Sequence, residues 1–219
     1  MVFLPGLVGF LFVLTAEAKI GKSVGSSICT ETKECLDFDL ICETENYEVR
    51  HYDSAKWVST QEESYFMEMA TSRAFRRLFK YITGANANGT KIDMTTPVLI
   101  DVKDKPFWKI GNFTMSFLLP SEYQEDPPQP TDPSVYLHET PDMNVYVRSY
   151  GGWMTTFTDT SKASGLSQDL KSAGAKFNKQ VHYAVGYNSP MTLLNRRNEV
   201  WFFAEDDPVC SSSSSEESV

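Results

Sequence analysis

The amino-acid sequence predicts an α+β domain over about residues 46–205, built from two related halves of roughly βαββ order. Two segments with apolar residues at helical spacing are separated by segments in which apolar and polar residues alternate, as in half-buried strands. A pattern of V-R-x-Y followed by W-x-[ST]-T occurs at residues 49–60 and again at 147–156. The tetrapeptides at residues 95–98 and 188–191 are similar in the same order, with chance similarity as the alternative for both matches. Because two helices cannot cover both faces of a parallel sheet, a curved antiparallel or mixed sheet is expected.

The first half begins with an extended segment at residues 47–52, followed by a helix signal. Glu62 and Glu63 are expected near the start of this helix, where the helix dipole favours negative charge. Apolar residues then recur at spacings near three and four, and Gly84 is expected to end the helix. Two strands should follow, at residues 92–102 and 113–119.

The second half follows a stiff, proline-rich loop at residues 126–133. We interpret this loop as a connection within one domain, because the second half is too short to fold well alone. A helix is expected over about residues 159–173, where Ala163, Leu166 and Leu170 share helical spacing. The strands of this half are expected at residues 135–138, 144–150, 181–187 and 199–204.

Composition excludes several classes of protein. The chain has 219 residues, of which 41% are hydrophobic and 13% aromatic, which is too apolar for a disordered chain and sufficient to build a core. Its formal net charge is −9, with 20 Lys and Arg against 29 Asp and Glu. Nucleic acids and anionic membranes attract proteins through positive charge, so neither is an expected partner.

Both ends of the chain are expected to lie outside the fold. Residues 2–14 are almost wholly apolar and precede an A-E-A motif, which is typical of a signal peptide spanning residues 1–18. This run is too short for a membrane span, which needs about 20 residues. We therefore expect a secreted, extracellular protein without membrane insertion. Residues 19–45 then form a Cys-bearing extension, and the acidic, Ser-rich residues 206–219 form a disordered tail.

Sequons and cysteines agree with that compartment. Asn88 and Asn112 each begin an Asn-X-Thr sequon for N-glycosylation. An oxidising compartment favours two disulfides among the four cysteines, which are Cys29, Cys35, Cys42 and Cys210. Three pairings are possible, and we expect at least one bridge to tie the extension to itself or to the C-terminus. A zinc site or a catalytic thiol is the alternative, although the chain has no C-x-x-C pair.

Motifs of the common enzyme classes are missing from the sequence, among them G-x-S-x-G, H-E-x-x-H, the Walker loop and G-x-G-x-x-G. Glu199 is the most enzyme-like residue, because it could be a partly buried carboxylate in the last strand. A structural salt bridge to Arg196 or Arg197 explains it at least as well. We therefore expect no catalytic activity.

The chain resembles the SOUL haem-binding family over about residues 46–205. Seven segments are similar to motifs of that family in order: Tyr47–Tyr52, Lys56–Thr60, Lys80–Ile82, Met94–Val98, Pro120–Glu122, Ala184–Pro190 and Arg197–Trp201. The resemblance implies a distorted β-barrel of two pseudo-symmetric βαββ halves flanked by two α-helices. It also implies non-catalytic, non-covalent binding of haem and other tetrapyrroles. With its signal peptide, the chain resembles a secreted member that buffers or carries haem.

Haem needs an apolar slot, partners for its two propionates and, optionally, an axial ligand. The first helix could line such a slot with apolar side chains that include Leu78, Phe75 and Phe79. The resemblance supports Phe75 and Phe79, which match positions where the founding branch of the family carries methionines facing the porphyrin. A plain core stripe is the alternative for residues at this spacing.

Three histidines are present. His51 shares a strand face with Tyr47 and Val49, and neutral imidazole is a sound ligand for iron. The resemblance makes His51 a candidate axial ligand, as in the SOUL-type branch, and a surface strand histidine is the alternative. His138 and His182 are expected to face solvent.

The propionate partners depart from the family pattern. The founding branch has an arginine at the position of Ser72 and a lysine at the position of Thr192, and both residues are uncharged here. Lys80 matches a retained lysine. The neighbouring arginines of the first helix could substitute, but one residue along a helix turns a side chain by about 100°. The alternative function is therefore a secreted interaction or lipophilic-ligand-binding module that has kept the fold and lost haem binding.

Overall fold

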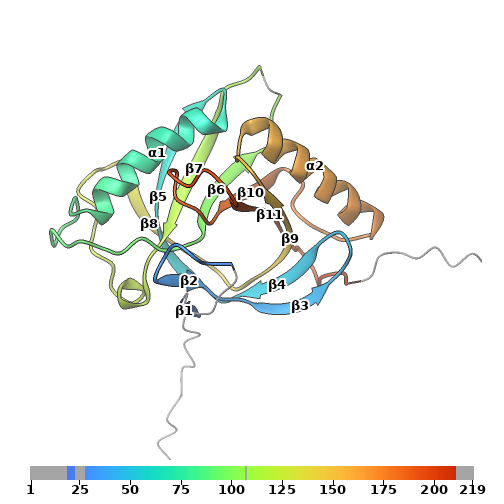
Figure 1. The fold of residues 1–219 in the computed structure, drawn as a ribbon, viewed down its shortest axis with the longest axis horizontal. Coiled ribbons are helices and arrows are strands. Elements are labelled where there is room, and N and C mark those ends of the chain that lie inside the picture. The colour runs from blue at the N-terminus through green and yellow to red at the C-terminus, as the bar shows by residue number, and fades with distance from the viewer. Residues whose placement is uncertain (1–18, 23–27, 107, 211–219) are drawn as a thin grey trace, which may run out of the picture.

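The computed structural model describes residues 19–22, 28–106 and 108–210 (Figure 1). The expected signal peptide and residues 211–219 of the expected tail lie outside the described residues. Within the described part, neither α-helix is long and apolar enough to cross a membrane.

The N-terminal segment contributes three strands, which are β1 (Ile20–Lys22), β2 (Glu34–Leu36) and β3 (Asp39–Glu43). The first half contains β4 (Glu48–Tyr52), β5 (Ala55–Ser64), α1 (Met67–Ile82), β6 (Val98–Lys103) and β7 (Gly111–Leu118). A 3-10 helix at Ser121–Tyr123 follows. The second half contains β8 (Val135–Thr140), β9 (Met143–Gly151), α2 (Thr156–Ser172), β10 (Val181–Gly186) and β11 (Arg197–Phe203).

The predicted α+β class with two related halves and two flanking helices is confirmed. Nine strands form one antiparallel sheet in the order β3-β4-β9-β11-β10-β6-β7-β5-β8. The pattern is symmetric about the β6–β10 pair, because β7, β5 and β8 on one side correspond to β11, β9 and β4 on the other. Each half thus has the order ββαββ, and its first strand pairs with the second strand of the other half. This exchange makes the two halves interdependent.

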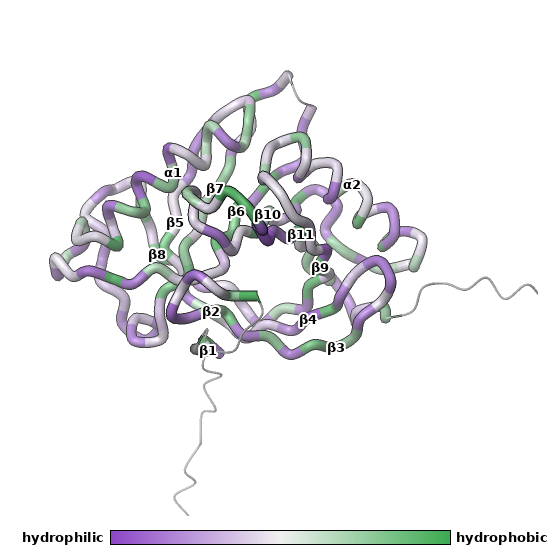
Figure 2. The backbone as a smooth tube through the Cα atoms, in the orientation of Figure 1, coloured by the Kyte–Doolittle hydropathy of each residue, from purple (hydrophilic) through white to green (hydrophobic). Residues whose placement is uncertain are grey.

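Both helices lie on the outer face of the curved sheet, whose two ends turn toward each other on the inner side (Figure 1). α1 packs mainly on β5 and β7, and α2 packs on β9 and β11. Alternation along each strand sends neighbours to opposite faces, so Phe117 packs beneath α1 whereas Leu118 lies on the inner side with Trp57 and Trp201. Figure 2 shows apolar stretches in central strands such as β6 and mixed polar and apolar residues along both helices. The fold therefore has one core under each helix and one inside the curve.

The start of α1 differs from the prediction. Glu62 and Glu63 lie in β5, opposite Phe113 and Asn112 of β7, so the expectation that they open the helix is wrong. Pairing across the sheet outweighs the local preference of acidic residues for a helix start, because tertiary context decides such ambiguous segments. α1 instead begins at Met67, with Glu68 as the acidic residue in its first turn.

The starts of one strand and one helix also differ from the prediction, for local reasons. β6 begins at Val98 and not at residue 92, because Pro97 has no N–H group to donate to a ladder. α2 begins at Thr156, three residues earlier than predicted. Thr155 caps it: its hydroxyl accepts from the Thr158 backbone, and the Thr158 hydroxyl bonds back to the Thr155 N–H.

The two halves are related, but not through the motifs that first indicated a repeat. Residues 49–52 lie in β4, and residues 147–150 lie in β9, which pairs with β4 and corresponds to β5. Trp57 is fully buried in β5, whereas Trp153 is half-exposed before α2. The sequence similarity therefore relates neighbouring strands rather than symmetry-related ones.

The Cys-bearing extension is an integral part of the fold. β3 extends the main sheet, and β1 and β2 lie between the two ends of that sheet (Figure 1). Cys29, Cys35 and Leu36 are buried in the inner core. Of the three possible pairings the structure has Cys29–Cys35 and Cys42–Cys210, so one bridge closes the extension on itself and the other ties it to the C-terminus, as expected.

Candidate functional site

An aromatic pair marks the exposed side of α1. Phe75 and Phe79, one helical turn apart, are stacked with ring centroids 5.8 Å apart. Phe75 also meets the edge of Phe117 on β7, at 5.3 Å, so it is anchored on the core. Phe79 is 48% exposed. The predicted slot residues Phe75 and Phe79 are therefore brought together at the surface, with one ring anchored and one accessible.

Leu78 does not share this position. Its side chain is fully buried beneath α1, together with Ala74 and Tyr81. The helix stripe that contains Leu78 is therefore plain core, and the expectation that Leu78 lines a ligand slot is wrong. The helical period explains the difference, because Leu78 is turned by about 100° from Phe79.

A loop with exposed apolar side chains follows β10. Gly186, the last residue of β10, pairs with Val98 at the start of β6, and Val98 packs against the same core as Phe75. The loop that follows, residues 188–196, carries three strongly exposed apolar side chains, Met191 (86%), Leu193 (71%) and Leu194 (79%). We call Phe75, Phe79, Val98 and these three loop residues the α1–loop surface. The loop residues were missed in the sequence, where only the N-S-P motif drew attention to them.

Positive charge borders this surface. Arg76 and Lys80 are exposed on α1 next to Phe79 in sequence, and no ion pair joins either to another described residue. Arg73 and Arg77 instead pair with Glu62 of β5. Lys80 and Arg76 are therefore two exposed cations that flank Phe79 within one helical turn, and a role of Lys80 in haem binding stays a prediction.

His51 lies elsewhere. It belongs to β4, which pairs with β3 and β9, whereas α1 packs on β5 and β7. Its Nδ1 is 3.0 Å from Oδ1 of Asn144, and its Nε2 is 3.4 Å from a carboxylate oxygen of Asp53. The structure does not bring His51 together with the aromatic pair, and both of its ring nitrogens face oxygen atoms. Ligation of iron by His51 remains a prediction from the sequence.

The other two histidines are less exposed than expected. His182 is buried, with Nε2 2.7 Å from the carboxylate of Asp159 on α2. His138 is partly buried beside Ser59, and burial lowers the pKa of its imidazole. The expectation that both face solvent is wrong, because the sequence pattern did not show which strand faces would be covered.

Glu199 is buried within the inner core and is fully paired. The guanidinium of Arg50 donates to both of its oxygens, at 3.0 and 3.1 Å, and Arg197 donates at 2.8 Å. Tyr187 and Trp201 donate at 2.9 and 2.8 Å. Burial acts to raise the pKa of this carboxyl, but the charge and hydrogen bonds of Arg50 outweigh it and hold the pKa below its usual range. A structural ion pair is therefore the right interpretation of Glu199.

Arg196 is not a partner of that carboxylate. Its guanidinium donates to backbone carbonyl oxygens of Ser189 and Thr192, within the apolar loop. It also lies 4.7 Å from the ring centroid of Trp153. Of the two alternatives for the predicted salt bridge, the one with Arg197 is present, and Arg50 is the partner that the sequence did not reveal.

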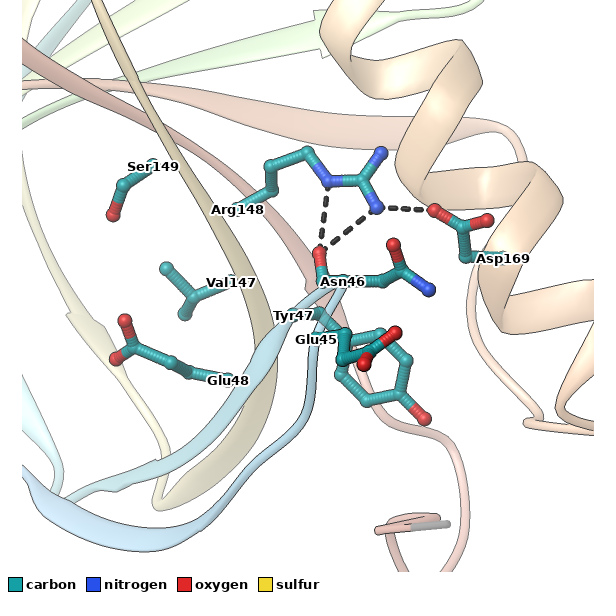
Figure 3. Close-up of a pocket in the computed structure, with 8 residues that line it drawn as sticks. All are labelled: Glu45, Asn46, Tyr47, Glu48, Val147, Arg148, Ser149 and Asp169. Carbon is teal, nitrogen blue, oxygen red and sulfur yellow. Dashed lines mark hydrogen bonds and ion pairs between the residues drawn. The ribbon is translucent and has the colours of Figure 1, made fainter. Parts of the chain in front are cut away.

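A polar pocket of about 390 Å³ lies where the start of β4 meets β9 and α2 (Figure 3). Arg148 donates to the carbonyl oxygen of Asn46, at 2.9 and 2.8 Å, and pairs with Asp169. Glu45 and Glu48 also line it. An acidic, polar lining does not suit the apolar plane of a haem, and none of the residues predicted to bind haem lines this pocket. Among the described residues, no group of three or more His, Cys, Asp or Glu is placed to hold a metal ion.

Comparisons with known proteins agree with the resemblance noted in the sequence. The chain is 39% identical over 166 residues to heme-binding protein 2 of Homo sapiens, covering 75% of this chain and 80% of that protein. It is 30% identical over 157 residues to heme-binding protein 1 of Xenopus laevis, covering 71% and 82%. The solved C-terminal domain of EcmrR shares the fold, with a TM-score of 0.50 at 11% identity over 73% of this chain and 98% of that one.

The family profile described as SOUL heme-binding protein matches residues 33–203, which is most of the chain. The match begins within the extension, just before β2, and so includes β2 and β3 as well as both halves. The chain therefore belongs to the SOUL heme-binding protein family.

Proposed function

We propose that this protein binds haem non-covalently and without catalysis on the α1–loop surface. The observations that support it are the stacked pair Phe75 and Phe79, which is anchored on the core, and the exposed apolar residues of loop 188–196. Family membership supports the ligand class, because the relatives are named heme-binding proteins and not enzymes.

The residues present suit the two parts of a haem. The porphyrin is a flat apolar plane that gains free energy when aromatic and aliphatic side chains remove it from water. The propionates are anions, and Arg76 and Lys80 provide exposed positive charge beside Phe79. Ser72, on the same exposed side of α1, contributes no charge. Haem supplies its own iron chemistry, and this chain supplies the binding surface.

A haemin titration of the purified protein, followed by absorbance, tests the proposal. We expect a saturable one-to-one shift of the Soret band. Replacing both rings (Phe75→Ser with Phe79→Ser) should weaken binding at least about tenfold, because two aromatic contacts are lost. Phe157→Ser is the matched control, since Phe157 is equally apolar and 70% exposed but lies on α2. A linear, non-saturating response in the unmodified protein would contradict the proposal.

His51→Ala decides the question of the axial ligand. His51 lies on β4, which pairs with β9, whereas α1 packs on β5 and β7. We therefore expect the variant to keep the Soret maximum of the unmodified protein. A displaced maximum in the variant would establish His51 as the ligand, as the sequence predicted.

A second candidate function is binding of another lipophilic ligand or a partner protein on the same surface. The uncharged residues Ser72 and Thr192 favour it, because fewer cations face the apolar surface than in the founding branch of the family. A hydrophobic dye that binds saturably and is lost in the Phe75/Phe79 variant, with no saturable haemin response, would support this function instead.

We infer further that the protein is secreted and buffers or carries haem outside the cell. The apolar N-terminal run supports secretion, as do the two disulfides. Asn88 and Asn112 are exposed, which makes both sequons accessible to glycosylation. When the chain is expressed in a secreting cell, the protein recovered from the culture medium should begin at Lys19. Its mass should fall after removal of N-glycans. Retention inside the cell with an intact N-terminus would contradict secretion.

A further inference from the structure

The carboxylate of Glu31, in the N-terminal extension, is held by the apolar loop. Three donors from that loop converge on it: Nδ2 of Asn188 at 2.7 Å, the backbone N–H of Ser189 at 2.6 Å and the hydroxyl of Thr192 at 2.8 Å. These lengths are those of hydrogen bonds to a charged acceptor. Loop 188–196 therefore forms a receptor for a carboxylate, which we call the 188–192 nest.

The donors of the nest are oriented by contacts that do not involve Glu31. The backbone N–H of Arg197 donates to Oδ1 of Asn188 at 2.7 Å, which turns Nδ2 of that amide toward the nest. Arg196 donates to the carbonyl oxygens of Ser189 and Thr192, at 2.9 and 2.6 Å, and so braces the loop. A receptor organised in this way keeps its shape when its occupant leaves, and another carboxylate could then bind.

The electrostatics of the nest favour an anion. Burial acts to raise the pKa of Glu31, but hydrogen bonds from Ser189, Asn188 and Thr192 and the charge of Arg196 outweigh it, so the pKa is lowered. The carboxylate is thus bound in its charged form at neutral pH.

Glu31 could leave without unfolding the extension. Glu34 accepts from the backbone N–H and the hydroxyl of Ser121, at 2.7 and 2.9 Å, and the Cys29–Cys35 bridge is buried in the inner core. These contacts hold the extension on either side of Glu31. The side chain of Glu31 itself is exposed apart from its contacts with the nest.

We propose that the 188–192 nest is a carboxylate-binding site that the chain occupies with its own Glu31, and that a carboxylate of an apolar ligand competes with Glu31 for it. The same loop carries the exposed Met191, Leu193 and Leu194, so a ligand with an apolar body and an acidic arm meets both features. If the proposed function holds, that arm is a haem propionate, and the extension lowers the affinity for haem.

A titration with sodium propionate, in the absence of haem, tests the nest itself. In amide nuclear magnetic resonance spectra of the Glu31→Ala protein, the Ser189 N–H should move from its position in the unmodified protein, because its acceptor is gone. Added sodium propionate should return it saturably. The unmodified protein should not respond, nor should Glu34→Ala, which removes a neighbouring carboxylate of the extension but leaves the nest occupied. Glu31→Gln, which keeps the size of the side chain, should respond to propionate more strongly than the unmodified protein. No saturable response in either Glu31 variant would overturn the proposal.

A second titration separates this proposal from haem binding. Glu31→Ala should raise the affinity for haemin roughly threefold to tenfold, as expected when one competing charged hydrogen-bond acceptor is removed. The affinity for haemin dimethyl ester, in which both propionates are blocked, should not change, and Glu34→Ala should alter neither. Equal gains for haemin and its ester would contradict competition for a carboxylate site. A propionate response in the Glu31 variants without haemin binding in any protein would retain the nest and reject haem as its ligand.

Discussion

Arg50 on β4 and Glu199 on β11 form a bidentate ion pair across the intervening strand β9, and both side chains are completely buried. β4 belongs to the first half and β11 to the second, so the pair joins the two halves on the inner side of the sheet. Tyr52, which also accepts from Arg50 at 3.2 Å, stacks on Trp201 with ring centroids 4.7 Å apart. The pair is thus the polar centre of an otherwise apolar core.

Removing one partner of this pair should be strongly destabilising. Glu199→Gln removes the buried counter-charge of Arg50 and leaves only the partly exposed Glu48, 2.7 Å away, to balance the guanidinium; loss of one partner of a buried pair typically costs about 3–5 kcal/mol. Chemical denaturation at pH 7 measures the loss. Lys33→Ala is the control, because the Lys33–Asp93 pair is largely exposed and should contribute less than about 1 kcal/mol. A loss of similar size in both variants would show that burial of the Arg50–Glu199 pair is not what matters.

His138 and Glu199 should make two contributions of the same sign to the pH dependence of stability. Burial lowers the pKa of His138, so the folded state disfavours its proton, and stability should be lost as the pH falls below about 6.5, the usual value for histidine. The lowered pKa of Glu199 means that its contribution is present above about 4.3 and is lost below that, as the carboxylate is protonated in the folded state.

Denaturation midpoints between pH 8 and pH 2.5 check both parts. His138→Gln should remove the loss of stability below about pH 6.5 and leave the loss below about pH 4.3 unchanged. The difference in stability between the unmodified protein and Glu199→Gln should shrink as the acidic range is entered. A difference that stays constant down to the lowest pH would mean that the pKa of Glu199 is not lowered in the folded state.

Charge beside the aromatic pair should control how haemin binding depends on salt. Arg76→Glu reverses one of the two exposed cations beside Phe79 and should weaken haemin binding roughly threefold to tenfold at low ionic strength, with a smaller effect at high salt. Lys171→Glu, in the last turn of α2, makes the same change in net charge at an exposed position away from this surface. Equal effects of the two variants would indicate a response to net charge alone, and would remove Arg76 from the binding surface.

The sequence predicted the class of fold and most strands, because alternation and helical spacing report directly on which side of an element is buried. It placed Glu62 and Glu63 in a helix because short acidic segments carry little information about partners across a sheet. The aromatic pair Phe75 and Phe79 was found, whereas the Arg50–Glu199 pair was not, since its members are 149 residues apart. Local pattern cannot reveal a contact that only the exchange of strands between halves creates.

The same limit applied to the loop and the extension. The exposure of Leu193 and Leu194 runs against their hydrophobicity, so no pattern of burial could have identified them as surface residues. Glu31 meets the loop only because the extension crosses the inner side of the sheet. The composition of the extension suggested a separate appendage, and its buried cysteines make it part of the core.

The two disulfides should contribute unequally to stability. Cys42–Cys210 closes a loop with a sequence separation of 168 residues, whereas Cys29–Cys35 spans 6. In the chain-entropy model these loops correspond to about 5 and about 2 kcal/mol. The C-terminal bridge also secures Val209, whose backbone N–H donates to the hydroxyl of Tyr146 at 3.0 Å and whose carbonyl accepts from Tyr47 at 3.0 Å. Denaturation of the paired serine variants should therefore show the larger loss for Cys42→Ser with Cys210→Ser. The reverse order would mean that burial of Cys29 and Cys35 in the inner core, and not loop entropy, dominates the contribution of these bridges.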